Sequence, residues 1–216
     1  MRRARANRCR TGLLTLALLS AATAACRVES GEHAEAGERA RRTGYRGFLL
    51  AGAPPKPDFT LTDTEGRAYD FRAETDGFVT LVFFGYTYCP DVCPVHMASI
   101  AAVRRELPVS LQRRIKVVFV TVDPERDTAE RLRSWLDTFD RSFVGLRGEP
   151  ERVGGILQAM DLPPAVVPDT AGRDYLVGHA SQVIAFSPDG AVRVVYPFGT
   201  RQADWQHDLP RLAELP

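Results

Sequence analysis

The sequence predicts an α/β fold in which helices flank a central mixed sheet. Two continuous apolar runs, FVTLVFFG at residues 78–85 and IKVVFVTV at residues 115–122, are typical of strands that are buried on both faces of a sheet. A segment with helix signals follows each run, and alternating strands and helices imply a parallel sheet. Near the end of the chain, strand-like residues 182–186 and 192–196 flank the turn signal SPDG, so a closing hairpin adds antiparallel strands.

The folded part is predicted to begin with a short hairpin, because strand-like residues 58–61 and 68–71 flank the turn signal Thr64–Gly66. The first apolar run follows as a buried strand. A helix is then expected over residues 93–106, with Pro94 in its first turn, where the missing backbone N–H leaves no hydrogen bond unmade. The loop between this strand and this helix lies at the carboxyl end of the sheet, where open α/β sheets place their sites.

The second apolar run leads into another helix. Asp127 and Glu130 have capping-box spacing, and the helix is expected to continue to about Phe139. The remaining elements are expected to be a short strand, a helix, the closing hairpin and a final helix, at residues 143–146, 151–160, 182–196 and 202–213. This order predicts a thioredoxin-like domain over residues 58–216 with an added N-terminal β-hairpin.

The first 25 residues are typical of a secretory signal peptide. They contain five arginines and no Lys, Asp or Glu, and their apolar residues 12–25 are too few to span a bilayer. The sequence Thr23–Cys26 resembles a bacterial lipobox, in which the cysteine is acylated and becomes the new N-terminus. Cleavage after Ala24 without a lipid, and an uncleaved anchor, are the alternatives. Acylation of Cys26 would make the protein a lipoprotein of the bacterial cell envelope, with its domain on the periplasmic or outer face.

Residues 26–57 are predicted to be a flexible membrane tether. The segment is polar, is rich in Glu, Arg, Ala and Gly, and ends in a region with three prolines. The whole chain has a net charge of +1, but five arginines lie in the signal, so the remainder carries a charge of −4. A mildly acidic mature chain is not typical of a nucleic-acid-binding protein, and no nucleic-acid partner is expected.

The chemistry of the folded part depends on two cysteines. Of the four cysteines in the chain, Cys9 leaves with the signal and Cys26 belongs to the tether, which leaves Cys89 and Cys93. The export signal places this pair in an oxidising compartment, where it could form a disulfide, a redox couple or a soft-metal site. Three residues separate the two, one more than in a thioredoxin-like redox motif. Cys93 lies at the start of the predicted helix and Cys89 in the loop just before it, where free N–H groups are expected to lower the pKa of both thiols.

Three sequence blocks resemble the Sco/SenC family of copper chaperones. GYTYCPDVCP at residues 85–94 is similar to the family's first signature, VTVDPERDT at residues 120–128 to the second, and YLVGHAS at residues 175–181 to the third. The resemblance runs from about Pro57 to the C-terminus, with the blocks in the family's order. A lone pair of cysteines with this spacing would be a weak signal, whereas the combination of three blocks is specific.

The resemblance implies a thioredoxin-like domain that binds one copper through Cys89, Cys93 and His179. Two thiolates and one imidazole suit Cu(I), and the same ligands can hold Cu(II). The implied role is to help assemble the copper A centre of cytochrome c oxidase, which is metal binding and transfer rather than enzymatic catalysis. The implied partners are the copper A subunit of the oxidase and a periplasmic copper donor. The alternative is a periplasmic thiol–disulfide oxidoreductase that reduces the target's cysteines, which needs both sulfurs but not the histidine.

Further residues near these blocks bear on the site. Asp123 ends the second central strand, where it could act behind the ligands, face a partner, or cap its own loop. His96 and Met97, three and four residues after the second cysteine, are interpreted as residues of the exposed and buried faces of the helix rather than as ligands. The family commonly has Asp before the histidine, whereas this chain has Gly178. The sequence therefore leaves open what holds the loop around His179.

Overall fold

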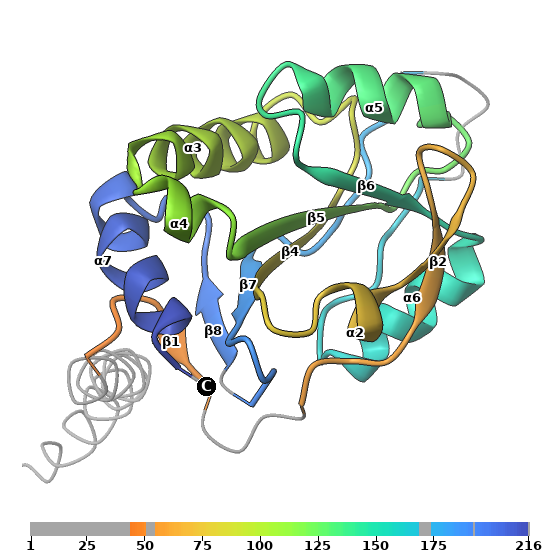
Figure 1. The fold of residues 1–216 in the computed structure, drawn as a ribbon. Helices are drawn as coiled ribbons and strands as arrows, with labels where there is room; N and C mark the ends of the chain where they lie inside the picture. Colours follow the sequence, from red (N-terminus) through yellow and green to blue (C-terminus); the bar gives the residue numbers. More distant parts are fainter. Residues whose placement is uncertain (1–43, 51–54, 169–173, 192, 216) are drawn as a thin grey trace, which may run out of the picture. The chain divides into compact units, whose positions relative to one another are not determined.

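The structure is a computed structural model that describes residues 44–50, 55–168, 174–191 and 193–215. These residues form a mixed sheet of eight strands in the order β1-β8-β7-β4-β5-β6-β2-β3. Figure 1 shows the sheet running through the folded part with helices on both sides. The predicted α/β architecture is confirmed. The strands are β1 (Phe48–Leu49), β2 (Thr60–Asp63), β3 (Ala68–Asp70), β4 (Val79–Gly85), β5 (Ile115–Thr121), β6 (Val144–Arg147), β7 (Val183–Phe186) and β8 (Arg193–Tyr196).

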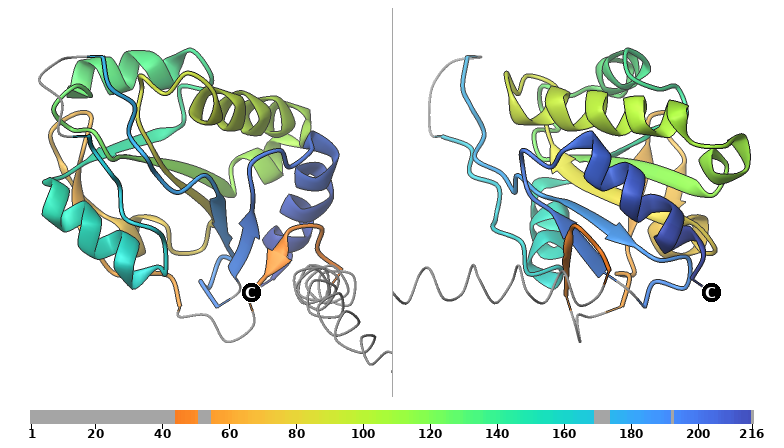
Figure 2. Two further views of the ribbon diagram at one scale, coloured as in Figure 1. Left: turned by 180° about the vertical axis from the view of Figure 1, so that it is seen from behind. Right: turned by 90° about the vertical axis from the view of Figure 1, so that its left-hand side faces the viewer.

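The helices lie on both faces of the sheet. Helices α3 and α5 connect β4, β5 and β6, which are parallel neighbours, and right-handed crossovers in one direction place both helices on one face. Figures 1 and 2 show α3 and α5 on one side of the sheet and α6 on the other, and α7 packs against α3. The helices are α2 (Phe71–Glu74), α3 (Val92–Glu106), α4 (Val109–Gln112), α5 (Ala129–Asp137), α6 (Pro150–Ala159) and α7 (Gln202–Ala213).

Strand β4, which leads into the cysteine loop, lies in the middle of the sheet. All seven of its residues are buried, and it pairs in parallel with β5 and antiparallel with β7. Neighbours on both edges and helices on both faces explain why its sequence is continuously apolar rather than alternating. The buried strands predicted from the two apolar runs are confirmed.

Both predicted hairpins are present. Strands β2 and β3 pair antiparallel, and β2 joins the sheet through β6. Strands β7 and β8 pair antiparallel around the SPDG turn, in which Gly190 has a φ of 73°. Glycine adopts this left-handed conformation without the steric cost that other residues meet, so the turn residue fits its position.

The start of α5 differs from the prediction. Its N-cap is Thr128, whose side chain accepts a hydrogen bond from the N–H of Arg131, so Asp127 is not the capping residue. Asp127 is instead buried and accepts hydrogen bonds from the N–H and hydroxyl of Thr87 and from the hydroxyl of Thr121. Because Thr87 lies in the cysteine loop and Thr121 ends β5, this carboxylate ties the loop to the neighbouring strand.

The last part of the predicted tether, residues 26–57, makes contacts with the folded domain. Strand β1 pairs with β8, and the N–H groups of Arg46 and Gly47 donate to the carboxylate of Asp208. Lys56 is buried, and its N–H donates to a carbonyl in the turn of the closing hairpin. A strand of two residues has no alternation to reveal it, and its partners lie far along the chain. The predicted signal segment, Cys9 and Cys26 lie outside the described residues.

Within the described residues, no helix combines the length and apolar character needed to cross a membrane.

We expect Asp208→Asn to destabilise the domain by about 2–4 kcal/mol. The carboxylate is fully buried and accepts hydrogen bonds at 2.9–3.0 Å from the N–H groups of Arg46 and Gly47 and from the hydroxyl of Tyr196. An amide of the same size keeps one accepting oxygen and loses the charge, and hydrogen bonds to buried charged groups are worth about 1.5–3 kcal/mol each. Urea denaturation would measure the change. Asp204→Asn, whose partners are solvent-exposed arginines, is the matched control, and equal small losses in both variants would contradict the prediction.

Candidate metal centre

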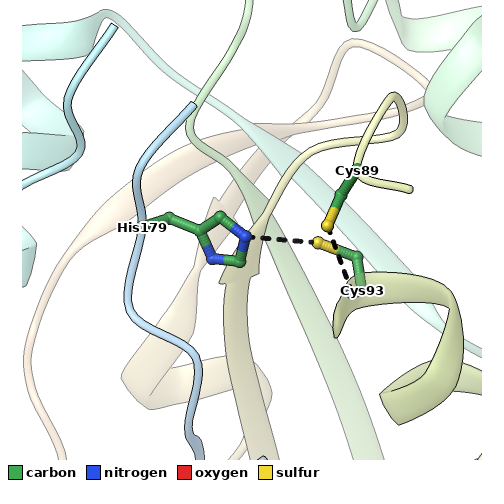
Figure 3. A group of neighbouring side chains, drawn as sticks. All are labelled: Cys89, Cys93 and His179. Carbon is green, nitrogen blue, oxygen red and sulfur yellow. Dashed lines mark hydrogen bonds between the residues drawn. The ribbon is translucent and has the colours of Figure 1, made fainter. Parts of the chain in front are cut away.

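Three segments that are distant in the sequence bring two sulfurs and one imidazole together. Cys89 lies in the loop after β4, Cys93 in the first turn of α3, and His179 in the segment before β7. Since β7 pairs with β4, the approach to β7 passes beside the end of β4. One ligand atom from each residue lies within 4.8 Å of the other two, and Figure 3 shows the three side chains pointing toward one another.

The two cysteines are free thiols rather than a disulfide. Cys93 is fully buried, whereas Cys89 is 9% exposed, and the N–H of Cys93 lies 3.5 Å from the sulfur of Cys89. Gly85, the last residue of β4, leaves the space for the deeper sulfur, since a Cβ there would lie 2.7 Å from Sγ of Cys93. A side chain at this position would therefore displace the thiol.

The imidazole of His179 has a defined tautomer and orientation. Its Nδ1 lies 2.8 Å from the carbonyl oxygen of Ala180, and a carbonyl only accepts, so Nδ1 carries the proton. This leaves the lone pair of Nε2 directed toward Sγ of Cys93 at 3.6 Å. The rings of Phe83 and Tyr86 meet the imidazole edge-on at 5.8 and 5.5 Å and restrict its rotation. A neutral imidazole with a free Nε2 is the form that binds metals.

The two thiols have opposite pKa shifts, which corrects the expectation that both would be lowered. The hydrogen bond from the Cys93 thiol lowers the pKa of Cys89 to about 4, helped by the backbone N–H groups of Cys93 and Asp91. Burial raises the pKa of Cys93, and its hydrogen bond to Cys89 raises it further. The free N–H groups at the start of α3 stabilise the thiolate of Cys89 in the loop, while the sulfur of Cys93 on the helix lies in the apolar core. The arrangement is therefore one thiolate and one thiol.

We expect iodoacetamide to alkylate Cys89 and spare Cys93 in the reduced, metal-free protein. Thiolates are the reactive form, and a pKa of about 4 keeps Cys89 ionised throughout pH 6–8. Its alkylation rate should be nearly constant over that range, whereas the rate of a free thiol with a pKa of ~8.5 rises roughly 100-fold. Mass spectrometry of peptides from timed samples would follow both sites. A Cys89 rate that rises in parallel with the free thiol would contradict the assignment.

Asp123 is buried rather than at the surface. It is 2% exposed, and its carboxylate accepts hydrogen bonds from Nε of Arg126 and, at 2.9 Å, from the hydroxyl of Tyr175. The guanidinium of Arg126 stacks 3.5 Å from the centre of the Tyr175 ring and donates to the Tyr175 carbonyl at 3.0 Å. Asp123 therefore contacts both its own loop, through Arg126, and the segment that carries His179, through Tyr175.

His96 is buried, which corrects the expectation that it lies on the exposed face of the helix, and Met97 is buried as expected. Neither belongs to the three-residue ligand group found among the described residues. Nε2 of His96 lies 2.8 Å from the carbonyl oxygen of Ser181. This contact and the contacts of Arg126 and Tyr175 were not predicted from the sequence. Arg126 and Tyr175 do lie within the second and third sequence blocks, which is the signal that could have drawn attention to them.

Comparisons with known proteins agree with this geometry. A family model described as SCO1/SenC matches residues 50–214. The chain is 31% identical over 182 residues to the mitochondrial SCO2 homolog of Bos taurus, covering 84% of this chain and 67% of that protein.

Two solved structures resemble the folded part. ScoI of Bradyrhizobium japonicum, solved with copper bound, has a TM-score of 0.65 and 30% identity, covering 74% of this chain and 99% of that one. The apo Sco1 protein of Thermus thermophilus has a TM-score of 0.67 and 32% identity, covering 78% and 96%. These similarities confirm the thioredoxin-like fold and the resemblance of the three sequence blocks, and this chain belongs to the SCO1/SenC family.

Proposed function

We propose that the protein binds one copper through Cys89, Cys93 and His179 and delivers it during assembly of the copper A centre of cytochrome c oxidase. The observation that carries the proposal is the convergence of two sulfurs and one imidazole nitrogen within 4.8 Å. An ion that binds sulfur and nitrogen at about 2.0–2.3 Å keeps its ligand atoms within about 4.6 Å of one another, so the arrangement is close to what binding needs. The copper-bound ScoI structure at 30% identity supports the choice of metal.

The donor set favours copper over harder metals. Thiolate sulfur is a soft ligand that selects Cu(I), and imidazole binds either oxidation state of copper. Because Cys93 is a thiol in this structure, copper binding must displace its proton, whereas the Cys89 thiolate is already available. His179 donates from Nδ1 to Ala180, so Nε2 is the nitrogen that faces the sulfurs.

The burial of the three ligands is compatible with transfer. Cys93 is fully buried, while Cys89 and His179 lie nearer the surface. A recipient ligand would therefore approach from the side of Cys89 and His179 and exchange with these two first. Such a transfer breaks and forms only metal–ligand bonds and no covalent bond of the recipient, in keeping with an assembly factor rather than an enzyme.

A second function, thiol–disulfide reduction of the target, is supported by the low pKa of Cys89. The Cys89 thiolate would attack a target disulfide and form a mixed disulfide, releasing one target thiolate. Cys93, after losing its proton, would attack the Cys89 sulfur and release the second. Two electrons pass from the cysteine pair to the target, which leaves its cysteines reduced for copper.

Anaerobic copper titration tests the first function. We expect binding to saturate at one copper per chain, and Cu(II) should give an intense sulfur-to-metal charge-transfer band. In cells that lack the protein, copper A activity should fall and should return when the chain is restored. Saturation without any sulfur charge-transfer band, or unchanged oxidase activity in the deletion strain, would contradict the proposal.

We further propose that acylated Cys26 anchors the protein to the membrane, supported by the basic start, the short apolar run and the small residues that precede Cys26. Cys26→Ser should move the protein from the membrane fraction to the soluble periplasm, because a serine cannot carry the thioether-linked lipid. Fractionation and immunoblotting would measure this. A native N-terminus that mass spectrometry shows to be an unmodified Cys26, or to retain signal residues, would contradict the anchor.

A further inference from the structure

The segment that carries His179 has little regular structure of its own. Residues 174–182 contain a single isolated bridge, formed by two backbone hydrogen bonds of 2.8 and 2.9 Å between Gly178 and Val166. Gly178 also has no side chain with which to orient the neighbouring imidazole. A ligand on a freely moving segment would lose conformational entropy when a metal binds, and this loss would weaken binding. Contacts from elsewhere in the fold must therefore hold the segment.

Helix α3 supplies one such contact through His96. The His96 side chain is 3% exposed, and its Nε2 lies 2.8 Å from the carbonyl oxygen of Ser181. Since the carbonyl only accepts, Nε2 donates the hydrogen bond. Ser181 is two residues after His179, and His96 is about one helical turn after Cys93. One hydrogen bond therefore joins the helix that carries a cysteine to the segment that carries the histidine.

The ring of His96 is itself fixed by packing. It lies 5.1 Å from the ring of Phe83, and the edge-on contact with Phe198 has a centroid distance of 5.7 Å. Phe83 also contacts the ring of His179, so the two imidazoles share one aromatic neighbour on β4. A donor held between two aromatic rings keeps its hydrogen bond to Ser181 in one geometry, and this fixes the backbone two residues after His179.

The opposite end of the segment is held independently. Tyr175, four residues before His179, donates its hydroxyl to Asp123, and Arg126 donates to the carbonyl of Tyr175. His179 thus lies between two tied points, one on the loop after β5 and one on α3. Of the two, the hydrogen bond from His96 is the one made by the helix that carries a metal ligand, Cys93 on α3.

We propose that His96 is a positioning residue that holds His179 within reach of the two sulfurs before copper arrives. The inference rests on the proposed copper function and adds a residue that affects copper binding through His179. His96 does not serve as a ligand, because its Nε2 is occupied by Ser181 and it lies outside the ligand group. A site that is already ordered loses less entropy on binding, so the hydrogen bond should strengthen copper binding.

Two substitutions separate the hydrogen bond from the imidazole. His96→Gln keeps an N–H donor that can reach Ser181 but removes the imidazole, whereas His96→Phe keeps a packed ring and removes the donor. Ile100→Val, another buried change in α3, controls for general loss of stability. Hydrogen exchange of the metal-free protein, read on peptides covering residues 174–182, and competitive Cu(I) titration are the two readouts.

We expect His96→Phe to exchange several-fold faster in this segment and to bind Cu(I) roughly 10-fold more weakly, as changes to residues that orient a metal ligand commonly do. His96→Gln and Ile100→Val should remain close to the original protein in both readouts. Loss of copper binding in His96→Gln with unchanged hydrogen exchange would overturn the proposal in favour of His96 as a ligand. If His96→Phe matched the original protein in both hydrogen exchange and Cu(I) binding, His96 would only pack in the core and the proposal would be overturned. If His96→Phe fails to fold, His96→Leu tests the same loss of donor.

The exchange readout needs no metal. If the original protein fails to bind copper, the proposed function fails, while the hydrogen-exchange comparison still decides whether His96 orders the His179 segment.

Discussion

Replacing Cys93 by serine is expected to abolish the thiolate-to-copper charge-transfer band and to weaken Cu(I) binding by more than roughly 100-fold. Serine has nearly the size of cysteine, but its hydroxyl is a hard ligand that stays protonated near neutral pH. Changes to residues that merely orient a metal ligand cost about 10–100-fold, so the loss of a ligand costs more. Anaerobic titration against a competing chelator, with absorption spectra of the Cu(II) form, would measure both effects.

The tether cysteine provides a matched control for this substitution. Cys26→Ser makes the same chemical change outside the ligand group and should leave copper binding unchanged. The substitution changes a fully buried site beside Gly85. Thermal unfolding of the metal-free variant therefore checks that the fold is intact. If a variant with both Cys89 and Cys93 replaced still held one copper per chain, the site would lie elsewhere.

His179→Ala is expected to separate copper handling from thiol chemistry. The imidazole contributes the third ligand, so its removal should weaken copper binding by more than the roughly 10–100-fold typical of residues that only orient a ligand. The disulfide between Cys89 and Cys93 should still form and break. Its reduction potential depends mainly on the stability of the Cys89 thiolate, and the largest contributions to that stability come from Cys93 and the backbone at the start of α3. Copper affinity, reduction potential and oxidase activity should be measured in parallel.

The results of this substitution distinguish the two proposed functions. His207→Ala, a histidine on α7 outside the ligand group, is the control. Lost copper affinity together with lost oxidase assembly would support the chaperone. Oxidase assembly that survives the loss of copper affinity would favour the thiol–disulfide reductase. Unchanged copper affinity with lost reductase activity would contradict His179 as a ligand.

The sequence by itself determined the architecture and the three candidate ligands. Continuous apolar runs mark β4 and β5, since strands covered on both faces have no polar side to show. Turn residues mark both hairpins, and the final helix has the bounds that were predicted, Gln202–Ala213. The three ligands were implied by the resemblance of the three sequence blocks to the Sco/SenC family. The apolar runs, the turn residues and the sequence blocks are each local in the chain, so they can be read without knowledge of the fold.

Only the tertiary structure decided how the ligands differ and what supports them. Cys93 begins a helix and Cys89 lies just before it, yet burial leaves Cys93 a thiol, while the hydrogen bond from Cys93 and nearby backbone N–H groups stabilise the Cys89 thiolate. Asp127 has the spacing of a capping residue but is buried against Thr87 and Thr121.

The contacts that support the His179 segment could not be predicted from the sequence either. His96 and Ser181 are separated by 85 positions, and Asp123 and Tyr175 by 52. The pairing of β1 with β8 joins residues still farther apart. A buried polar group needs a partner, but which partner it finds depends on how distant segments pack, and no local pattern records that choice.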